Sequence, residues 1–440
     1  MAGDPLLNNL WVLIAGLLVF AMTVAVGFLE VGELGESVNR SLLKTLLMSG
    51  LAVVVMAIVG FNIGFAPTWY GLIGNPFYSQ GFFLGGFTSN VATTFGTTWW
   101  SMGPSYFNTG LYPGTYFLFE VAFASVTLAL VGVVVLRKVK LTSFAVYSVV
   151  YFVIIWTLPA AWIWNPSGWL ARMGMVDFAG GLVVHGAAGA AGLGILAVVW
   201  QEERARGHRT SPSTPYAVRP GWLALSILLL WMGWFGFNPG SVLQFNSEAI
   251  VVVLTTFVAA AAGMLSLVGV QYLRGRTLAD LASAVNGTLM GLIVITPLAG
   301  FVSPASALVL GLVSGPIFVL AEKQFAKVKW FSDPVGLFPG HLVGGLFGIC
   351  MIPVFAQGGF AGPSGYPNLP NGLLFGGGVA AVHQLGLELL GVVAVMATVF
   401  AISYVTMRII SAASGGILSA PEPGERPAVG PDVAAAKGVA

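Results

Sequence analysis

The stretch DFAGGLVVHGAAGAAG, residues 177–192, places one aspartate and one histidine among glycine, alanine and valine. Of the 440 residues in the chain, 57% are hydrophobic and 8% are charged. Because a soluble domain carries roughly 25% charged residues, this composition indicates an integral membrane protein. The apolar residues form long runs rather than alternating segments of about ten residues, which favours helices over a β-barrel. Asp177 and His185 are therefore expected within, or at the edge of, a lipid bilayer.

Eleven apolar segments reach the length of about 20 residues that is needed to cross the hydrocarbon core. They lie near residues 8–30, 42–65, 114–136, 142–164, 177–200, 221–239, 247–270, 280–300, 303–322, 335–356 and 380–411. The first segment lacks a basic flank and is too long for the core of a signal peptide, so we expect a retained helix. The predicted fold class is an all-α polytopic membrane protein whose eleven transmembrane helices occupy residues 1–420.

The positions of lysine and arginine predict how the chain is oriented. The basic residues that follow odd-numbered segments or end the chain are Arg40, Lys44, Arg137, Lys138, Lys140, Arg204, Arg206, Arg209, Arg219, Arg274, Arg276, Lys323, Lys327, Lys329, Arg408, Arg426 and Lys437. Only Arg172 breaks this pattern. By the positive-inside rule, we expect the N-terminus outside and the C-terminus in the cytoplasm, which requires an odd number of spans. The sequence thus predicts a multi-pass protein of the plasma membrane.

Two outer connections and the C-terminal tail differ in composition from the spans. Residues 66–113 and 357–379 contain no charged residue. The aromatic residues of the first connection include Trp69, Tyr70, Phe82, Phe83, Trp99, Trp100 and Tyr106. We expect interfacial aromatic belts and lid loops there. The tail PEPGERPAVGPDVAAAKGVA, residues 421–440, is dominated by proline, glycine and alanine and is expected to be a short, disordered cytoplasmic segment.

A weak internal repeat relates the fifth and tenth segments. Asp177 and His185 are eight residues apart, as are Asp333 and His341, and each histidine is followed by glycine four residues later. The two segments hold corresponding places in two five-helix halves, and because five is odd, the second half must be inverted. Such repeats place their functional site near the bilayer midplane. We therefore predict an inverted 5+5 repeat followed by one long helix.

The eight-residue spacing predicts where the two charged groups lie. Along one helix it corresponds to about 12 Å, which would place the carboxylate near the membrane surface and the imidazole well inside. The carboxylate would then lie in the first turn, where the helix dipole favours an anion. The glycines and alanines around each histidine would let neighbouring helices approach closely.

Three interpretations compete for the histidines. His208 is expected in a solvated loop and His383 in a structural position, whereas His185 and His341 share an equivalent depth. A zinc site would need three or four ligands, and no cysteine or carboxylate lies at that depth, so we expect no metal. A structural pair is the second interpretation. We favour a lined pathway, because ionisable groups inside a membrane are costly and two imidazoles offer a donor and an acceptor to a small solute.

DFAGGLVVHGAAGAAG resembles the signature of the Amt/Rh family of ammonium transporters. Three further segments agree with the family in order and spacing: WNPSGWL at 164–170, WMGWFGFNPGS at 231–241 and DPVGLFPGHLVGG at 333–345. The similarity extends from about residue 10 to about residue 415. The resemblance implies eleven helices, an outside N-terminus and a homotrimer with one pore per subunit, and the Amt branch fits better than the Rh branch.

The resemblance also implies roles for individual residues. The implied site consists of the twin pore histidines His185 and His341, the phenylalanine gate Phe123 and Phe237, the ammonium-recruitment residues Trp164, Ser241 and Phe119, the pore-lining Trp234, and the supporting carboxylates Asp177 and Asp333. Without the resemblance, a single phenylalanine in such a chain would be assigned to packing. Likewise, Trp164 would be an interface anchor and Ser241 a helix-end cap.

The function implied by the resemblance is ammonium transport: recruitment of the ion, its deprotonation, and passage of ammonia with or without a separately moved proton. The alternatives are an Rh-like channel for neutral ammonia or carbon dioxide, and an ammonium sensor, for which the roughly 20-residue tail is below domain size. An enzyme is not expected, because the sequence has no HExxH, no nucleophile with a base and no cofactor fingerprint. We expect ammonium, ammonia and lipid as partners, and no cofactor or nucleic acid.

Three features depart from the family pattern. Glu120 stands where many members have glutamine, and GFLEVGELGESVNR at 27–40 is unusually acidic. The tail lacks the extended acidic motif through which many members meet a PII regulator, so the sequence gives no support for that partner.

Overall fold

The chain crosses a membrane-sized layer eleven times within the residues that the structure describes. The computed structural model describes residues 5–77, 111, 113–135, 137–207, 218–278, 280–331, 333 and 335–419. Within these ranges, the helices long and apolar enough to span a bilayer are Pro5–Glu33, Val38–Phe65, Gly114–Val135, Leu141–Ile163, Gly181–Ala205, Pro220–Gly240, Ser247–Leu273, Leu281–Leu298, Pro304–Phe325, Phe338–Phe355 and Gly378–Ser414. The predicted eleven-helix fold class is confirmed, while the orientation of the termini stays a prediction.

Several spans are built from more than one helical element. The first half contains α1 (Pro5–Glu33), α2 (Val38–Val55), η1 (Met56–Gly60), α3 (Phe61–Phe65), α6 (Pro113–Val135), α7 (Leu141–Val150), η4 (Tyr151–Ile155), α8 (Thr157–Ile163), α9 (Trp169–Met173), η5 (Gly181–Gly186) and α10 (Ala187–Ala205). The remainder contains α11 (Pro220–Gly240), α12 (Ser247–Leu273), α13 (Leu281–Ile295), η6 (Thr296–Leu298), α14 (Pro304–Phe325), η7 (Phe338–Leu342), α15 (Val343–Phe355), α16 (Gly358–Ala361), η8 (Leu373–Phe375) and α17 (Gly378–Ser414). A short hairpin of β1 (Thr68–Trp69) and β2 (Ile73–Gly74) pairs Thr68 with Gly74.

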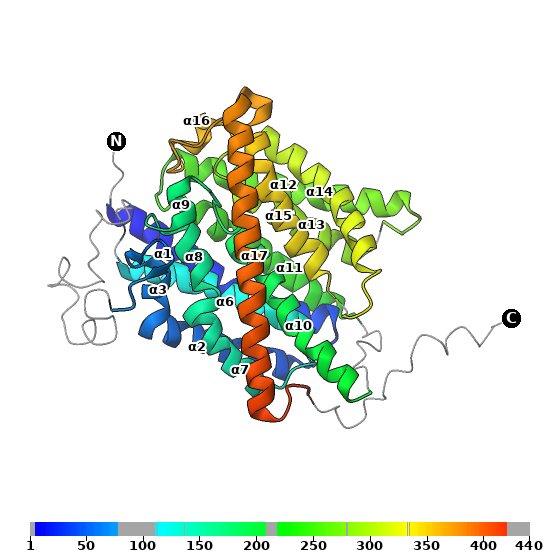
Figure 1. Ribbon diagram of the computed structural model, residues 1–440. Coiled ribbons are helices and arrows are strands. Elements are labelled where there is room, and N and C mark those ends of the chain that lie inside the picture. The colour runs from blue at the N-terminus through cyan, green and yellow to red at the C-terminus, as the bar shows by residue number, and fades with distance from the viewer. Residues whose placement is uncertain are drawn as a thin grey trace.

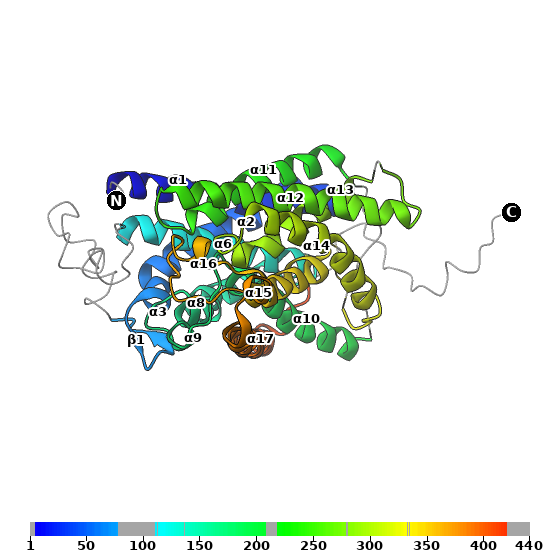
Figure 2. The same ribbon diagram turned by 90° about the horizontal axis from the view of Figure 1, so that it is seen from above.

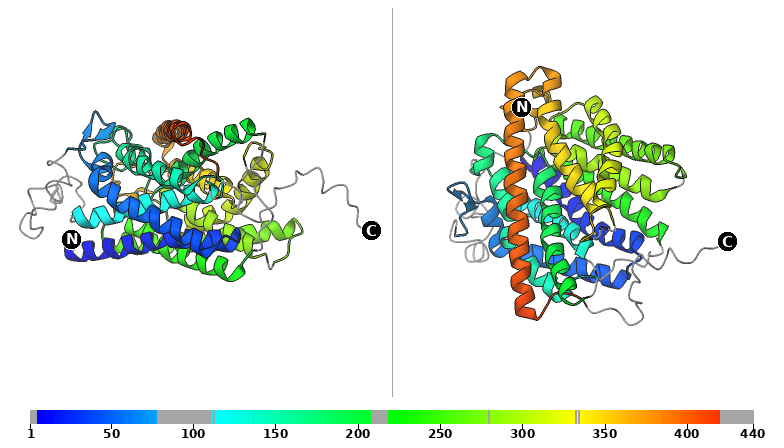
Figure 3. Two further views of the ribbon diagram at one scale, coloured as in Figure 1. Left: turned by 90° about the horizontal axis from the view of Figure 1, so that it is seen from below. Right: turned by 45° about the vertical axis from the view of Figure 1, so that its right-hand side comes forward.

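The helices surround two nearly completely buried spans, α6 and α10. Figure 1 shows α17 crossing the front of the bundle along its whole length, where it packs on α7, α10 and α15. In Figure 2 α17 is seen end-on, while α1, α11 and α12 form the opposite side of the molecule. The left panel of Figure 3 shows the same arrangement from below, with α17 again on the side away from α1. The centre of the bundle is therefore enclosed by helices from both halves of the chain.

The two histidine-bearing spans begin in the same way. η5, which holds His185, and η7, which holds His341, are π-helical turns that continue directly into the α-helices α10 and α15. Single π-helical turns of this kind occur often at functional sites. The repeat seen in the sequence thus extends to the local backbone structure.

The fifth span begins later than the hydropathy pattern predicts. It starts at Gly181 rather than at residue 177, because Gly180 has φ 114° and its left-handed conformation precedes the first helical turn. The eight residues from Asp177 to His185 are therefore not one continuous helix. Asp177 lies before the first helical turn and is 1% exposed, while its depth in the membrane stays a prediction.

The outer connections are described only in part. Trp69 and Tyr70, at the β1–β2 hairpin, are exposed. His383 is exposed near the start of α17. Phe82, Phe83, Trp99, Trp100, Tyr106, His208 and the tail 421–440 lie outside the described residues.

The unusually acidic stretch at 27–40 is held by ion pairs. The carboxylate of Glu30 is bound by Lys44, which is buried between α1 and α2, and by the hydroxyl group of Ser41. Glu36 accepts a 2.7 Å hydrogen bond from the Nε of Arg137 at the end of α6. Each of these carboxylates therefore has a cation, and together they tie α2 and α6 to the end of α1.

Glycines permit a close crossing of α12 and α13. A Cβ atom at Gly263 would lie 2.5 Å from the carbonyl oxygen of Gly287 and 2.8 Å from the Cα of Gly291. Nothing lies within 4 Å of the corresponding point at Gly269, further along α12.

We expect Gly263→Ala to lower the free energy of unfolding by about 1–3 kcal/mol, because the added methyl group must push two helix backbones apart. The matched variant Gly269→Ala, on the same helix with open space at its Cβ position, should leave the thermal midpoint in detergent unchanged. Equal midpoints for the two variants would contradict the assigned crossing.

Glu36 makes stability depend on pH. Burial raises the pKa of Glu36, but Arg137, the N–H group of Ser37 and Arg40 outweigh burial and hold it below its usual value. A lowered carboxyl pKa stabilises the fold above the pKa of the unfolded chain, about 4.3, and the stabilisation disappears as pH falls through the folded value.

The thermal midpoint of Glu36→Gln should therefore lie below that of the unchanged chain at pH 7, and the two should converge below about pH 4. Melting curves from pH 3 to pH 8 test this. A difference between the two thermal midpoints that stays constant from pH 3 to pH 8 would show that the ion pairs of Glu36 do not contribute to stability.

Candidate functional site

Two buried imidazole rings meet in the middle of the bundle. The Nδ1 atoms of His185 and His341 are 3.1 Å apart, and the side chains are 1% and 7% exposed. One Nδ1 must carry a hydrogen and the other must accept it, so the two rings hold different tautomers. The structure thus brings together the two histidines that the sequence paired.

Aromatic rings fix the plane of the His185 imidazole. Phe237 and Trp234, both on α11, stack on it with interplanar angles of 12° and 22° and centroid distances of 5.9 and 5.7 Å. The Nε1 of Trp234 donates a 3.0 Å hydrogen bond to the hydroxyl group of Thr296, which fixes the indole. The Nε2 of His185 is buried and has no hydrogen-bond partner among the described residues, so it is free to bind a small solute.

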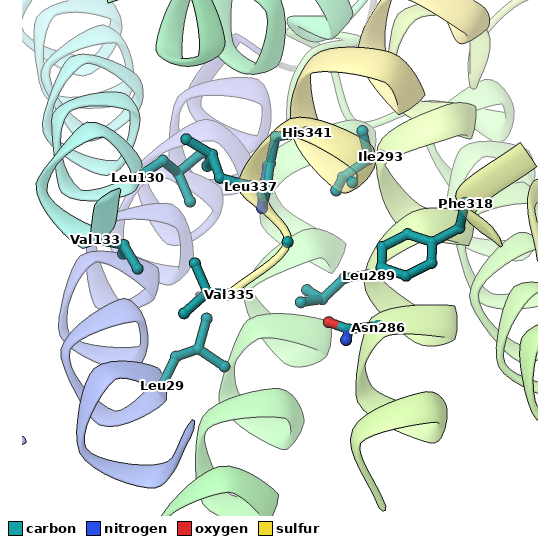
Figure 4. Close-up of a pocket in the computed structure, with 12 residues that line it drawn as sticks. Leu29, Leu130, Val133, Asn286, Leu289, Ile293, Phe318, Val335, Leu337 and His341 are labelled. Carbon is teal, nitrogen blue, oxygen red and sulfur yellow. The ribbon is translucent and has the colours of Figure 1, made fainter. Parts of the chain in front are cut away.

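Two cavities meet at His341. One is bordered by His185, Trp234 and Phe237. The other extends from His341 to Asn286 and is otherwise lined by apolar side chains (Figure 4). The residues that line both cavities are Leu29, Leu130, Leu289 and His341. The histidines therefore lie along a narrow and mostly apolar space inside the bundle.

Sequence reasoning missed Asn286 and the three leucines. A leucine that faces a cavity has the same hydropathy as one that faces lipid, so a single sequence carries no signal to separate them. Asn286 alone offered a signal, since an amide within an apolar span is unusual.

An aromatic column leads from Trp164 to the histidines. The ring of Phe123 lies edge-on to Trp164 at 5.6 Å and tilted against Phe237 at 4.3 Å. Phe119 packs on Phe123 at 4.8 Å. Since Phe237 also stacks on His185, the rings form a continuous row of contacts from the Trp164 end of the bundle to the imidazole pair.

Trp164 and Ser241 are both half-buried at the start of this column. The Nε1 of Trp164 donates a 2.8 Å hydrogen bond to the carbonyl oxygen of Asp177. The hydroxyl group of Ser241, just after α11, donates a 2.9 Å bond to the carbonyl oxygen of Phe237. The hydroxyl oxygen of Ser241 can still accept a hydrogen bond from a ligand.

Asp177 anchors the histidine-bearing span. Its carboxylate accepts backbone N–H bonds of 2.7–2.9 Å from Gly180, Gly181, Leu182 and Val183. These groups are the otherwise unpaired donors of a helix start, where the helix dipole also favours an anion. Burial raises the pKa of Asp177, and the four N–H bonds oppose the rise.

Asp333 has the same role at the tenth span. It accepts N–H bonds of 2.9 Å from Leu337 and 2.8 Å from Phe338. Burial raises the pKa of Asp333, while these bonds and nearby Lys138 oppose the rise. Burial in turn lowers the pKa of Lys138 to about 8. Both carboxylates therefore act on the helix starts that carry the histidines.

In the described residues, eleven helices long and apolar enough to span a bilayer enclose two hydrogen-bonded imidazoles, and together they define a multi-pass membrane protein. The chain belongs to the Ammonium Transporter Family, whose model matches residues 10–436. It is an integral protein of the plasma membrane.

Relatives and solved structures agree with this assignment. Ammonium transporter Amt1 of Archaeoglobus fulgidus is 29% identical over 420 residues, which cover 94% of this chain and 95% of the relative. The ammonium transporter of Bacillus subtilis is 28% identical over 413 residues, 92% of each chain. The crystal structure of Saccharomyces cerevisiae Mep2 superposes with a TM-score of 0.77 at 25% identity, covering 98% of this chain and 90% of that one. A sensor Amt protein gives a TM-score of 0.78 at 25% identity, with 94% and 95% covered.

We expect Asp177→Asn to lower the free energy of unfolding by about 3 kcal/mol, because an amide accepts fewer N–H bonds than a carboxylate and hydrogen bonds to charged groups contribute about 1.5–3 kcal/mol each. Thermal unfolding in detergent measures the loss. Glu322→Gln on α14, whose carboxylate caps no helix start in the described part of the chain, serves as the control. A melting curve for Asp177→Asn that matches this control would contradict the anchoring role.

Proposed function

We propose that this chain moves ammonium by recruiting the ion at the Trp164 end, removing one proton, and passing ammonia through the two cavities at His341, named here the conduit. The observation that carries the proposal is the hydrogen-bonded pair of His185 and His341 between these cavities. Membership of the Ammonium Transporter Family supports ammonium as the substrate.

The Trp164 end has the groups that a small cation needs. The faces of Trp164 and Phe123 attract a cation electrostatically. The hydroxyl oxygen of Ser241 can accept a hydrogen bond from ammonium. Phe119, packed on Phe123, extends the aromatic surface. The proposed recruitment site consists of these four side chains.

The cost of burial favours ammonia over ammonium within the conduit. The idealised cost of moving such an ion into a low-dielectric interior is of order 20 kcal/mol, and several kcal/mol remain after relaxation. An amine whose pKa lies roughly two to three units above neutral costs about 3–4 kcal/mol to deprotonate, at about 1.36 kcal/mol per unit. Potassium has no proton to lose and must bear the full cost, so the same step rejects it.

The histidines suit a neutral, hydrogen-bonding solute. Ammonia can donate to the unpartnered Nε2 of His185 and accept from an imidazole N–H of the pair. Phe123 and Phe237 form a proposed gate, since their rings lie 4.3 Å apart at the entrance to the conduit. Trp234 lines the wall beside His185.

Two other functions remain as candidates. The similarity to a sensor Amt protein over 94% of this chain favours ammonium sensing as the second candidate. A neutral gas channel for ammonia or carbon dioxide would use the same apolar conduit without moving charge. We further propose that the protein assembles as a homotrimer with one conduit in each subunit.

We expect His185→Ala and His341→Ala each to lower ammonium transport by at least about tenfold, because each variant removes the polar groups at the centre of the conduit. Methylammonium uptake into proteoliposomes measures the rate, and competition with potassium measures selectivity. His383→Ala, on the exposed face of α17, is the control. Unchanged rate and selectivity in both conduit variants would overturn the proposal.

Current recording on solid-supported membranes separates the remaining alternatives. A charge displacement on ammonium addition indicates that the proton crosses with ammonia, whereas uptake without current indicates the neutral gas channel. Ammonium binding without uptake indicates the sensor.

A further inference from the structure

A buried carboxyl group lies on the helix that carries Phe123 of the proposed gate. Glu120 on α6 follows Phe119 and precedes Phe123 by three residues, and it is 4% exposed. The hydroxyl group of Tyr116, one turn earlier, hydrogen-bonds to this carboxyl group. The Oε2 atom of Glu120 is buried and has no hydrogen-bond partner among the described residues. One oxygen of this carboxyl group is therefore free within the wall of the aromatic column.

The surroundings of Glu120 lead to Trp164. The ring of Tyr116 packs on Phe65 at 5.4 Å, Phe65 packs on Trp156 at 6.3 Å, and Trp156 packs on Trp164 at 6.2 Å. Phe123, on the same helix as Glu120, also contacts Trp164, edge-on at 5.6 Å. The hydroxyl partner of Glu120 and a residue three positions further along α6 thus both lead to Trp164.

The charged groups that act on the neighbouring Tyr366 are acidic. Burial raises the pKa of Tyr366, and the carboxylates of Asp177, Glu120 and Glu388 raise it further, so each of these carboxylates lies near Tyr366. No ion pair joins Glu120 to a lysine or arginine in the part of the chain that the structure describes. Arg172, the only basic residue in the connection between the fourth and fifth spans, is exposed.

A buried carboxylate with a free oxygen and no cation is costly. The cost disappears if the group holds a proton or contacts a positive ion. Ammonium meets both needs, because it is a cation that can also donate a proton. The carboxylate of Asp177 differs in this respect, since both of its oxygens accept backbone N–H bonds.

We propose that the Glu120 carboxylate is the proton acceptor for ammonium at the Trp164 end, a step that rests on the proposed transport function. One N–H bond of ammonium breaks, an O–H bond forms on Oε2, and the nitrogen keeps the electron pair. The resulting ammonia passes Phe123 and Phe237 into the conduit. The proton then moves from the carboxyl group to water at the Trp164 end, which restores the carboxylate for the next ion.

The test compares uptake by the full chain, Glu120→Gln and Glu388→Gln in proteoliposomes. Glu120→Gln keeps the shape of the side chain but cannot accept the proton, so the maximal rate should fall at least tenfold while KM changes less than threefold. Glu388→Gln is the matched control: Glu388 is 0% exposed and also has a free Oε2, but its other oxygen is held by Gln384 and the N–H group of Val176. Its maximal rate should stay within twofold of the unchanged chain.

A pH profile separates proton transfer from a structural role. The titratable groups facing Glu120 are Tyr116 on its own helix and Tyr366 on the connection after α16, with Asp177 and Glu388 beyond Tyr366. The maximal rate of the unchanged chain should fall as external pH drops, because a protonated carboxyl group cannot accept a proton. The plot of maximal rate against external pH should therefore show an inflection. This inflection should be absent in Glu120→Gln and present in Glu388→Gln.

Each outcome decides the proposal. An unchanged maximal rate in Glu120→Gln, a rise in KM alone, or an inflection that persists in that variant overturns it. If Glu120→Gln elutes as an aggregate, Glu120→Asp takes its place, and a displaced inflection supports the proposal while an unchanged one overturns it. Absence of uptake by the unchanged chain overturns the transport function itself, which distinguishes that failure from a failure of the Glu120 step.

Discussion

The cost of placing ionisable groups in an apolar bundle is the constraint on which the rest of the structure depends. His185 and His341 meet this constraint by bonding to each other through their Nδ1 atoms. That bond needs two helices from different halves of the chain at a fixed depth and rotation. The carboxylates of Asp177 and Asp333 supply this precision, because each binds the backbone N–H groups at the start of a histidine-bearing span. The polar atoms of the centre thus stabilise one another rather than being exposed to lipid.

The same constraint explains why many polar groups of the interior are paired with a hydrogen-bonding or charged partner. Lys44 is buried only together with Glu30, and the indole N–H groups of Trp164 and Trp234 bond to a carbonyl and a hydroxyl oxygen. In the described residues, twelve buried side-chain atoms have no hydrogen-bond partner, and the Nε2 of His185 and the Oε2 of Glu120 are two of them. His185 stacks on Phe237 at the end of the aromatic column, and Glu120 lies on the helix that carries Phe119 and Phe123. Under the proposed function, the solute supplies the hydrogen-bond partner that these two atoms lack.

Much of the fold could be predicted from the sequence, because hydropathy over about 20 residues directly reports a membrane span. The pairing of the two histidines was also predictable, since their equal spacing from an aspartate occurs twice. The start of the fifth span could not be predicted, because hydropathy carries no information on the left-handed backbone at Gly180. The cavity-lining positions of Leu29 and Leu289 could not be predicted either, since a leucine suits contact with a cavity and contact with lipid equally well. The free oxygen of Glu120 emerges only when its neighbours are placed in three dimensions.

The π-helical turns have a consequence for how the length of the chain can vary. A π-helical turn contains one residue more than the α-helical turn that it replaces. Deleting a single residue from η5 outside His185 can be absorbed by converting the π-helical turn into an ordinary one, which keeps the imidazole on about the same face of the helix. The same deletion within an α-helical turn would rotate every residue beyond it by about 100° about the helix axis. The two π-helical turns are therefore the places in their spans where chain length can change by one residue, provided that His185 and His341 themselves are kept.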